Sequence, residues 1–209
     1  MINSPIIYSG AMVRALLDGR KTMTRRLRWK LVKRGPHPDG AICFTNWNYV
    51  RPGDRLWVRE NWRAEARYDK LKPREIPAGS LISYEADYDQ EPNDGCRGKL
   101  RPAIFLPRWA SRMTLTVTAA KVEHLPDISE EDAIAEGFTA GKLDDGFGPR
   151  DIGDGWTIES PGGWASAAGH FQKLWCELHG FDSWDQNPEV VALSFTVHKS
   201  NIDQLSEVA

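Results

Sequence analysis

The sequence of 209 residues lacks any long apolar run, since no stretch approaches the roughly 18 apolar residues that a membrane-spanning helix needs. Its first residues, Met1 to Pro5, also lack the basic region followed by an apolar run that marks a secretory signal. With 41% apolar and 27% charged residues, the composition is that of an ordinary globular protein rather than a disordered or collagen-like chain. We therefore expect a cytoplasmic protein without a membrane partner.

Cysteine and histidine are too few and too scattered for the common metal or disulfide frameworks. The three cysteines include no CxxC pair, and the five histidines show no HExxH or similar spacing. This pattern argues against a disulfide scaffold and against a four-ligand zinc site. We expect no metal site and no cofactor. The cysteines, which we interpret as small apolar fillers, are Cys43, Cys96 and Cys176.

Charge is nearly balanced over the whole chain, at −2, but it is unevenly distributed. Residues 14–34 contain nine basic residues and a single acid, Asp18. Residues 127–159 contain ten acids and only two basic residues. The basic segment favours a partner that carries a phosphate or another anion. An equal alternative is a solvated basic face that pairs with the acidic segment of the same molecule.

Apolar periodicity and turn residues predict an α+β protein. Short helices lie among strands without a regular βαβ alternation, which favours a mostly antiparallel sheet or a small barrel. A glycine- and aspartate-rich segment at 141–163 and a polar one near 92–102 predict loops or insertions. The strands are expected at 5–8, 22–27, 41–50, 55–59, 81–85, 113–122 and 190–197, and the helices from Ser9 to Gly19, at 127–137 and at 164–179.

The octet from Gly19 to Arg26 joins a predicted helix end to a basic, threonine-rich strand. It fits the GxKxxxxR signature of the ASCH domain, a member of the PUA-like superfamily, through Gly19, Lys21 and Arg26. Residues 52–60 resemble that family's turn and second barrel strand, and residues 128–137 resemble its helix with a terminal acid. Residues 183–188 resemble the closing segment of a longer subgroup common in phages and prophages. The ordered resemblance spans residues 6 to about 195.

This resemblance implies a small PUA-like β-barrel with helices flanking a cleft. It implies a single domain over residues 1–198 with insertions near 69–102 and 141–163, followed by a polar tail at 199–209. Family members have been linked to RNA binding, and a small bacterial member is an amidohydrolase that removes the acyl group from 4-N-acetylcytidine. The catalytic lysine, threonine and glutamate of that enzyme match Lys21, Thr24 and Glu136. The insertions leave the substrate of this chain open.

An amide carbonyl is attacked by an alcohol when a base takes the hydroxyl proton, and a lysine serves if burial or a neighbouring cation lowers its pKa. Thr24 is then the nucleophile and Lys21 its base. Glu136 is an orienting group or proton relay, while Arg25 and Arg26 bind or polarise the substrate. Lys21 and Thr24 face opposite sides of a regular strand, so this mechanism requires Lys21 to lie in the irregular turn after Gly19.

Two further segments carry candidate substrate-binding residues. Glu60 follows a predicted strand, where cleft-lining residues are common, but it can instead pair with Arg59 or Arg63. Trp109 lies between two arginines, Arg108 and Arg112, in an arrangement that can stack a base and hold a phosphate. The same arrangement also suits a buried anchor whose arginines extend to solvent.

These observations leave three functions to compare. The first is a metal-independent amidohydrolase that cleaves a C–N amide bond of an acylated nucleoside or nucleotide such as 4-N-acetylcytidine. The second is a non-catalytic module that binds single-stranded RNA through residues 14–34. The third is a ribonuclease that uses the same cationic cleft. Without the family resemblance, the octet is an ordinary helix end with a solvated edge strand, and Glu136 is a surface residue.

Overall fold

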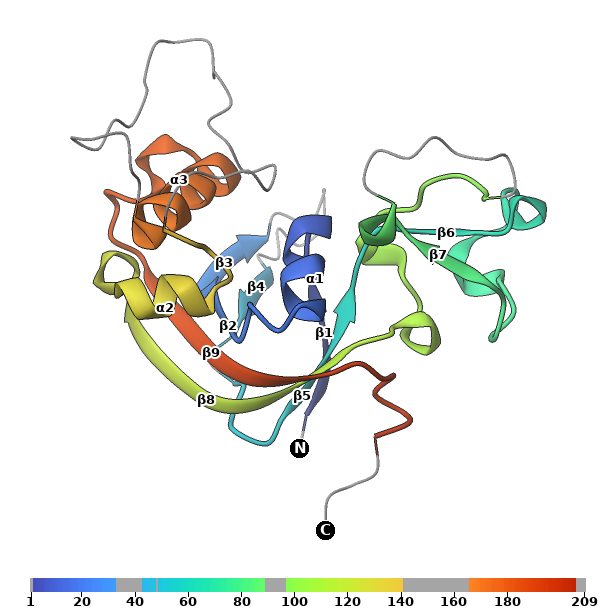
Figure 1. The fold of residues 1–209 in the computed structure, drawn as a ribbon, viewed down its shortest axis with the longest axis horizontal. Helices are drawn as coiled ribbons and strands as arrows, with labels where there is room; N and C mark the ends of the chain where they lie inside the picture. Colours follow the sequence, from blue (N-terminus) through green and yellow to red (C-terminus); the bar gives the residue numbers. More distant parts are fainter. Residues whose placement is uncertain (1, 33–42, 48, 89–96, 141–165, 206–209) are drawn as a thin grey trace. The chain divides into compact units, whose positions relative to one another are not determined.

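The computed structural model describes residues 2–32, 43–47, 49–88, 97–140 and 166–205, which form two compact units (Figure 1). Unit 1 comprises residues 1–22, 50–120 and 194–209, and unit 2 comprises residues 23–49 and 121–193. Helices and strands occur together, so the predicted α+β class is confirmed. The predicted insertion at 141–163 lies outside the described residues.

The largest sheet has five strands in the order β1-β5-β8-β9-β2. Strand β1 (Asn3–Ile7) pairs parallel with β5 (Arg55–Arg59), and β5 pairs antiparallel with β8 (Thr114–His124). The sheet is therefore mixed. Among the described strands its order runs from β1 to β2 (Met23–Leu27) through β9 (Glu189–His198), and it is not a closed barrel.

Helix α1 (Gly10–Leu17) of unit 1 has Ser9 at its N-cap and buries Val13 and Leu16. Gly19 follows with φ +74°, a left-handed conformation that glycine adopts without the steric cost of a Cβ atom. The backbone N–H of Lys21 then donates to the carbonyl of Ala15 at 3.0 Å. Lys21 therefore lies in the irregular turn before β2, as the predicted mechanism requires.

Unit 1 contains a second, smaller sheet of two strands. One strand precedes the predicted insertion near 69–102, and the other lies within it. Strand β6 (Trp62–Ala64) pairs antiparallel with β7 (Ile82–Tyr84). The predictions included a strand at 81–85 but no strand at 62–64. Around these two strands the chain forms short 3-10 helices at Ala66–Tyr68, Pro73–Glu75, Glu85–Asp87, Ala103–Phe105 and Arg108–Ala110. Their shared core consists of Trp62, Ala64, Ile76, Leu106 and Ala110.

The described part of the predicted polar tail is ordered against the segment that contains Trp109. Ile202 is buried, and the Asn201 side-chain amide donates to the carbonyl oxygens of Arg108 at 2.8 Å and of Ser111 at 2.7 Å. These hydrogen bonds fix residues 199–205 to unit 1. Among the residues that are described, no helix combines the length and the apolar character needed to cross a bilayer.

Unit 2 contains the antiparallel pair β3 (Trp29–Val32) and β4 (Cys43–Asn46) and the helices α2 (Glu130–Ala135) and α3 (Ala167–His179). The Glu130 carboxylate accepts hydrogen bonds from the N–H groups of Ala167 and Ala168, at 2.7 and 3.1 Å, and so links the two helices. Two further 3-10 turns lie at Leu125–Asp127 and Phe181–Ser183.

The apolar side chains of helix α3 are buried only in part. Phe171 and Trp175 are buried, with the Phe171 ring in an edge contact with Phe138. Leu178 is exposed. Leu178 lies in the last turn of the helix, shortly before the C-cap Gly180, and follows the last buried residue, Trp175.

Candidate functional site

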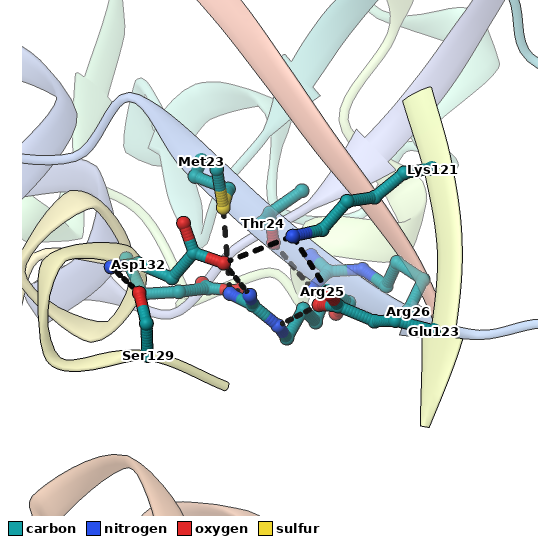
Figure 2. Close-up of polar contacts among 9 residues, drawn as sticks. Met23, Thr24, Arg25, Arg26, Lys121, Glu123, Ser129 and Asp132 are labelled. Atoms are coloured by element: carbon teal, nitrogen blue, oxygen red, sulfur yellow. Dashed lines mark hydrogen bonds and ion pairs between the residues drawn. The ribbon is translucent and has the colours of Figure 1, made fainter. Parts of the chain in front are cut away.

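Strand β2 carries Thr24 and Arg26 on one face and Arg25 on the other. Residues two apart on a strand share a face, so Thr24 lies beside Arg26, and Met23 beside Arg25. The Arg26 guanidinium (Nη1) donates to the Thr24 hydroxyl oxygen at 2.8 Å and to the Arg25 carbonyl at 3.0 Å. Figure 2 shows these contacts at the centre of the site. Thr24 is 0% exposed.

The Thr24–Arg26 contact has a chemical consequence. A hydroxyl oxygen that accepts from a cation keeps its own proton available for donation. The same cation favours the charged form of the hydroxyl, because opposite charge nearby stabilises an alkoxide. Thr24 is therefore held in an environment that suits a nucleophile.

Arg25 is enclosed by acidic side chains from two other elements of unit 2. Its Nε donates to Glu123 of β8 at 2.8 Å, and its Nη2 donates to Asp132 of α2 at 2.5 Å. Lys121 of β8 contacts the same two carboxylates, at 2.8 and 3.3 Å. Figure 2 shows this network, in which two cations share two acids.

Glu136 is a buried residue at the C-cap of α2. Ser129 caps the other end of this helix by accepting from the N–H of Asp132 at 3.1 Å, and Gly137 ends it with φ +98°. The Glu136 carboxylate Oε1 lies 3.6 Å from Nη1 of Arg25. The interpretation of Glu136 as a surface residue is therefore wrong, because burial and an arginine neighbour mark it as a positioned carboxylate.

Lys21 is a buried cation of unit 1. It is 1% exposed, and its Nζ lies 5.6 Å from the centroid of the Tyr8 ring, within the range of a cation–π contact. Lys21 and Thr24 are three positions apart in the chain, so their Cα atoms are at most about 11 Å apart. Lys21 belongs to unit 1 and Thr24 to unit 2.

Glu60 is buried in unit 1 and pairs with Arg112, not with Arg59 or Arg63 as the sequence suggested. Two hydrogen bonds of 2.9 Å join Arg112 to the Glu60 carboxylate, and Arg112 also donates twice to Asp87 at 2.8 Å. Burial raises the pKa of Glu60, and the Arg112 hydrogen bonds oppose this shift. Arg63 instead donates to Glu85 at 3.0 Å.

The ring of Tyr84 completes the Glu60 cluster. It lies 4.1 Å from the Arg112 guanidinium carbon, and its hydroxyl donates to the Ala110 carbonyl at 2.7 Å. Burial raises the pKa of Tyr84 to about 12, with a further contribution from the charge of Glu60. The cluster joins β7 to the segment around Ala110 and holds Glu60 in a fixed orientation.

The segment around Trp109 matches the buried-anchor interpretation better than the nucleotide-stacking one. Trp109 packs against the apolar core of the smaller sheet. Both flanking arginines have carboxylate partners, since Arg108 pairs with Asp203 and Arg112 pairs with Glu60. Arginines that are paired in this way are less available to a phosphate.

The described part of the basic segment pairs largely with acids of the same molecule. Arg20 pairs with Asp18, Arg28 pairs with Glu189, and Arg25 pairs with the acids of its network. Asp18, Glu189 and Glu123 lie outside the acidic segment at 127–159, and within that segment Arg25 pairs with Asp132 and Glu136. Lys33 and Arg34 lie outside the described residues. Within the described residues, no group of three His, Cys, Asp or Glu side chains is arranged to hold a metal ion.

The sequence interpretation missed the acids that surround Arg25 and the partners of Glu60. One signal was present, because Asp132 and Glu136 are four residues apart and therefore share one face of a helix. A buried arginine on a strand requires such partners. The members of the Arg25 and Glu60 clusters that the sequence interpretation did not single out are Tyr84, Asp87, Lys121, Glu123 and Asp132.

Comparisons with known proteins give no match for this chain. No protein-family model matches the sequence. Neither the search of curated proteins nor the search of solved structures finds a significant match. A functional assignment therefore rests on the motifs of the sequence and on the geometry described above.

Proposed function

We propose that this protein is an ASCH-type amidohydrolase, independent of metal ions, that removes an acyl group from the amine of a modified nucleoside or nucleotide such as 4-N-acetylcytidine. The observation that carries the proposal is the buried Thr24 hydroxyl, hydrogen bonded at 2.8 Å to the guanidinium of Arg26 within the family signature. In this proposal the five-stranded sheet contributes to a PUA-like barrel, and helices flank a substrate cleft.

The proposed reaction is a two-step acyl transfer. The Thr24 Oγ attacks the amide carbon while the Lys21 amine takes the hydroxyl proton, and the C–N bond breaks as that proton passes to the leaving amine. A water molecule then attacks the Thr24 ester, giving the free acid and regenerating the hydroxyl. The products are the unmodified nucleoside amine and a carboxylic acid, so atoms and charge balance.

Each proposed role has a physical basis. The Lys21 amine is buried, and in this proposal it acts in its neutral form as the base. Arg26 stabilises negative charge that develops on the Thr24 oxygen or on the carbonyl oxygen. Glu136 carries a fixed carboxylate that orients a proton donor or the leaving amine.

The test is release of the free amine from 4-N-acetylcytidine and from a series of related acyl nucleosides. Thr24→Val removes the hydroxyl with little change in shape, and we expect kcat/KM to fall by about 10³-fold or more because the nucleophile is lost. Lys21→Met should lose activity to a similar extent. The matched control is Thr22→Val, an exposed threonine of the same motif, which should retain the parental rate.

Three results would overturn the proposal, and two of them would identify a different function. Absence of amine release from every acyl nucleoside by the folded protein excludes the activity. Salt-dependent retention of single-stranded RNA without turnover identifies an RNA-binding module. Shortening of RNA that is lost in Lys21→Met identifies a ribonuclease.

A further inference from the structure

We propose that Arg25 is a positioning residue that acts through Glu136, and that it does not bind the substrate. This inference rests on the proposed function, in which Glu136 belongs to the catalytic group. It departs from the sequence interpretation, which placed Arg25 among the substrate contacts.

The first argument is that the guanidinium of Arg25 is occupied on every side. Its side chain is 0% exposed. Nε and Nη2 donate to carboxylates, and Nη1 lies 3.4 Å from the Met23 sulfur and 3.6 Å from Glu136. The ring of Phe171, from α3, lies 5.9 Å from the guanidinium carbon. A substrate anion would have to displace these groups.

The second argument concerns the orientation of α2, which Glu130 links to α3 and Arg25 links to β2. It is a helix of six residues in which Ala133 is the buried side chain, while Ile134 is exposed. Asp132 and Glu136 lie on the same face of this helix, and both approach the guanidinium of Arg25. The planar fork of arginine binds carboxylates in defined directions, so together with the Glu130 hydrogen bonds to α3 it fixes the rotation of α2 about its axis. That rotation determines where the Glu136 carboxylate points.

The third argument concerns charge. Arg25 and Lys121 supply two positive charges, whereas Glu123, Asp132 and Glu136 supply three negative charges. Lys121 is 58% exposed and bridges the two outer acids, Glu123 and Asp132. Arg25 is therefore the cation of this network that lies next to the buried Glu136, and it provides the opposite charge that a buried carboxylate needs.

The test is a comparison of Arg25→Lys with its parent. A lysine keeps the charge but lacks the fork, so it cannot hold Asp132 and Glu136 in the same geometry. We expect kcat for the acyl nucleoside to fall by about 10²-fold, as for a catalytic group displaced by about 1 Å, with KM unchanged within about 2-fold. A rise in KM with kcat preserved would show that Arg25 contacts the substrate and would overturn the proposal.

Two further variants guard against a trivial loss of folding. Asp132→Asn leaves Arg25 in place but weakens one of its two hydrogen-bonded anchors, and it should lower kcat in the same direction by a smaller factor. Lys121→Gln removes the exposed cation that contacts the same two acids, and it should leave kcat within about 3-fold, because exposed ion pairs contribute little. An equal loss in Lys121→Gln and Arg25→Lys would contradict a specific role for Arg25.

A spectroscopic measurement separates this inference from the proposed function. The side-chain carboxyl carbon of Glu136 can be assigned in a 13C-labelled protein by its absence in Glu136→Gln. We expect this resonance to shift in Arg25→Lys and to stay in place in Lys121→Gln, whether or not the protein turns over any acyl nucleoside. An unchanged Glu136 resonance in folded Arg25→Lys would overturn the inference even if the hydrolase activity is found.

Discussion

Two charged clusters, one in each unit, bury charge in opposite ways. In unit 2 the most deeply buried ion of the network is a cation, Arg25, which is surrounded by acids from β8 and α2. In the Glu60 cluster of unit 1 the buried ion is an anion, Glu60, and its partner Arg112 is partly exposed and also contacts Asp87. The two clusters therefore differ in what remains when the buried ion is removed. Removal of Arg25 leaves acids that are mostly buried, whereas removal of Glu60 leaves Arg112, which is partly exposed.

This difference determines what each buried ion contributes. If Arg25 is lost, acids that lie mostly inside the protein lose their common counter-charge, and burial of unpaired charge is costly. If Glu60 is lost, Arg112 keeps its hydrogen bonds to Asp87 and its contact with the Tyr84 ring. We infer that the Arg25 cluster holds unit 2 together, whereas the Glu60 cluster mainly orients side chains of unit 1.

The largest expected effect is that of Arg25→Gln on stability. We expect the free energy of unfolding of unit 2 to fall by about 3–5 kcal/mol, because one partner of a buried ion pair is removed and the acids remain. Urea unfolding followed by the fluorescence of the tryptophans measures this change. Arg20→Gln is the control, since Arg20 forms an exposed pair with Asp18 and should cost less than about 1 kcal/mol. Equal losses in the two variants would contradict the comparison.

A smaller loss than the about 3–5 kcal/mol of Arg25→Gln is expected for Glu60→Gln at neutral pH, because Arg112 is partly exposed and keeps its hydrogen bonds to Asp87. The difference should depend on pH. Because burial raises the pKa of Glu60, the folded protein binds this proton more tightly than the unfolded chain does. The parent should lose stability relative to Glu60→Gln as the pH rises from the unfolded pKa, about 4.3, through the folded pKa.

Urea unfolding of both proteins at pH 4 and at pH 7 tests this sign. The account predicts that, relative to the parent, the free energy of unfolding of Glu60→Gln is higher at pH 7 than at pH 4. A change of this difference in the opposite direction would show that the Arg112 hydrogen bonds outweigh burial in their effect on the pKa of Glu60. A loss at pH 7 as large as that of Arg25→Gln would remove the distinction between the two clusters.

Much of the local structure of the chain was predictable from the sequence. The period-2 pattern of residues 55–59 predicted β5, and the cap at Ser129 together with Gly137 predicted the limits of α2. The strand at 190–197 was also correct to within one residue at each end. Such features depend on neighbours in the sequence, so short windows contain the information that specifies them.

Features that depend on distant residues were not predictable in the same way. The partners of Arg25 lie 98 and 107 residues away, and no local pattern connects them. The parallel pairing of β1 with β5, which makes the sheet mixed, was not predicted by any local pattern. The barrel inferred from the resemblance is not closed among the described strands and stays part of the proposal. Glu136 was a candidate through the family resemblance alone, and its burial beside Arg25 could not be read from the sequence.

The most direct measurement of the central claim is capture of the acyl group on Thr24. The protein is mixed with 4-N-acetylcytidine or a more slowly hydrolysed acyl analogue, quenched in acid within the first turnover and digested for peptide mass spectrometry. The account predicts an ester on the peptide that contains Thr24, and its absence in Thr24→Val. Turnover by the parent with equal turnover by Thr24→Val, or an acyl group found on another residue, would contradict it.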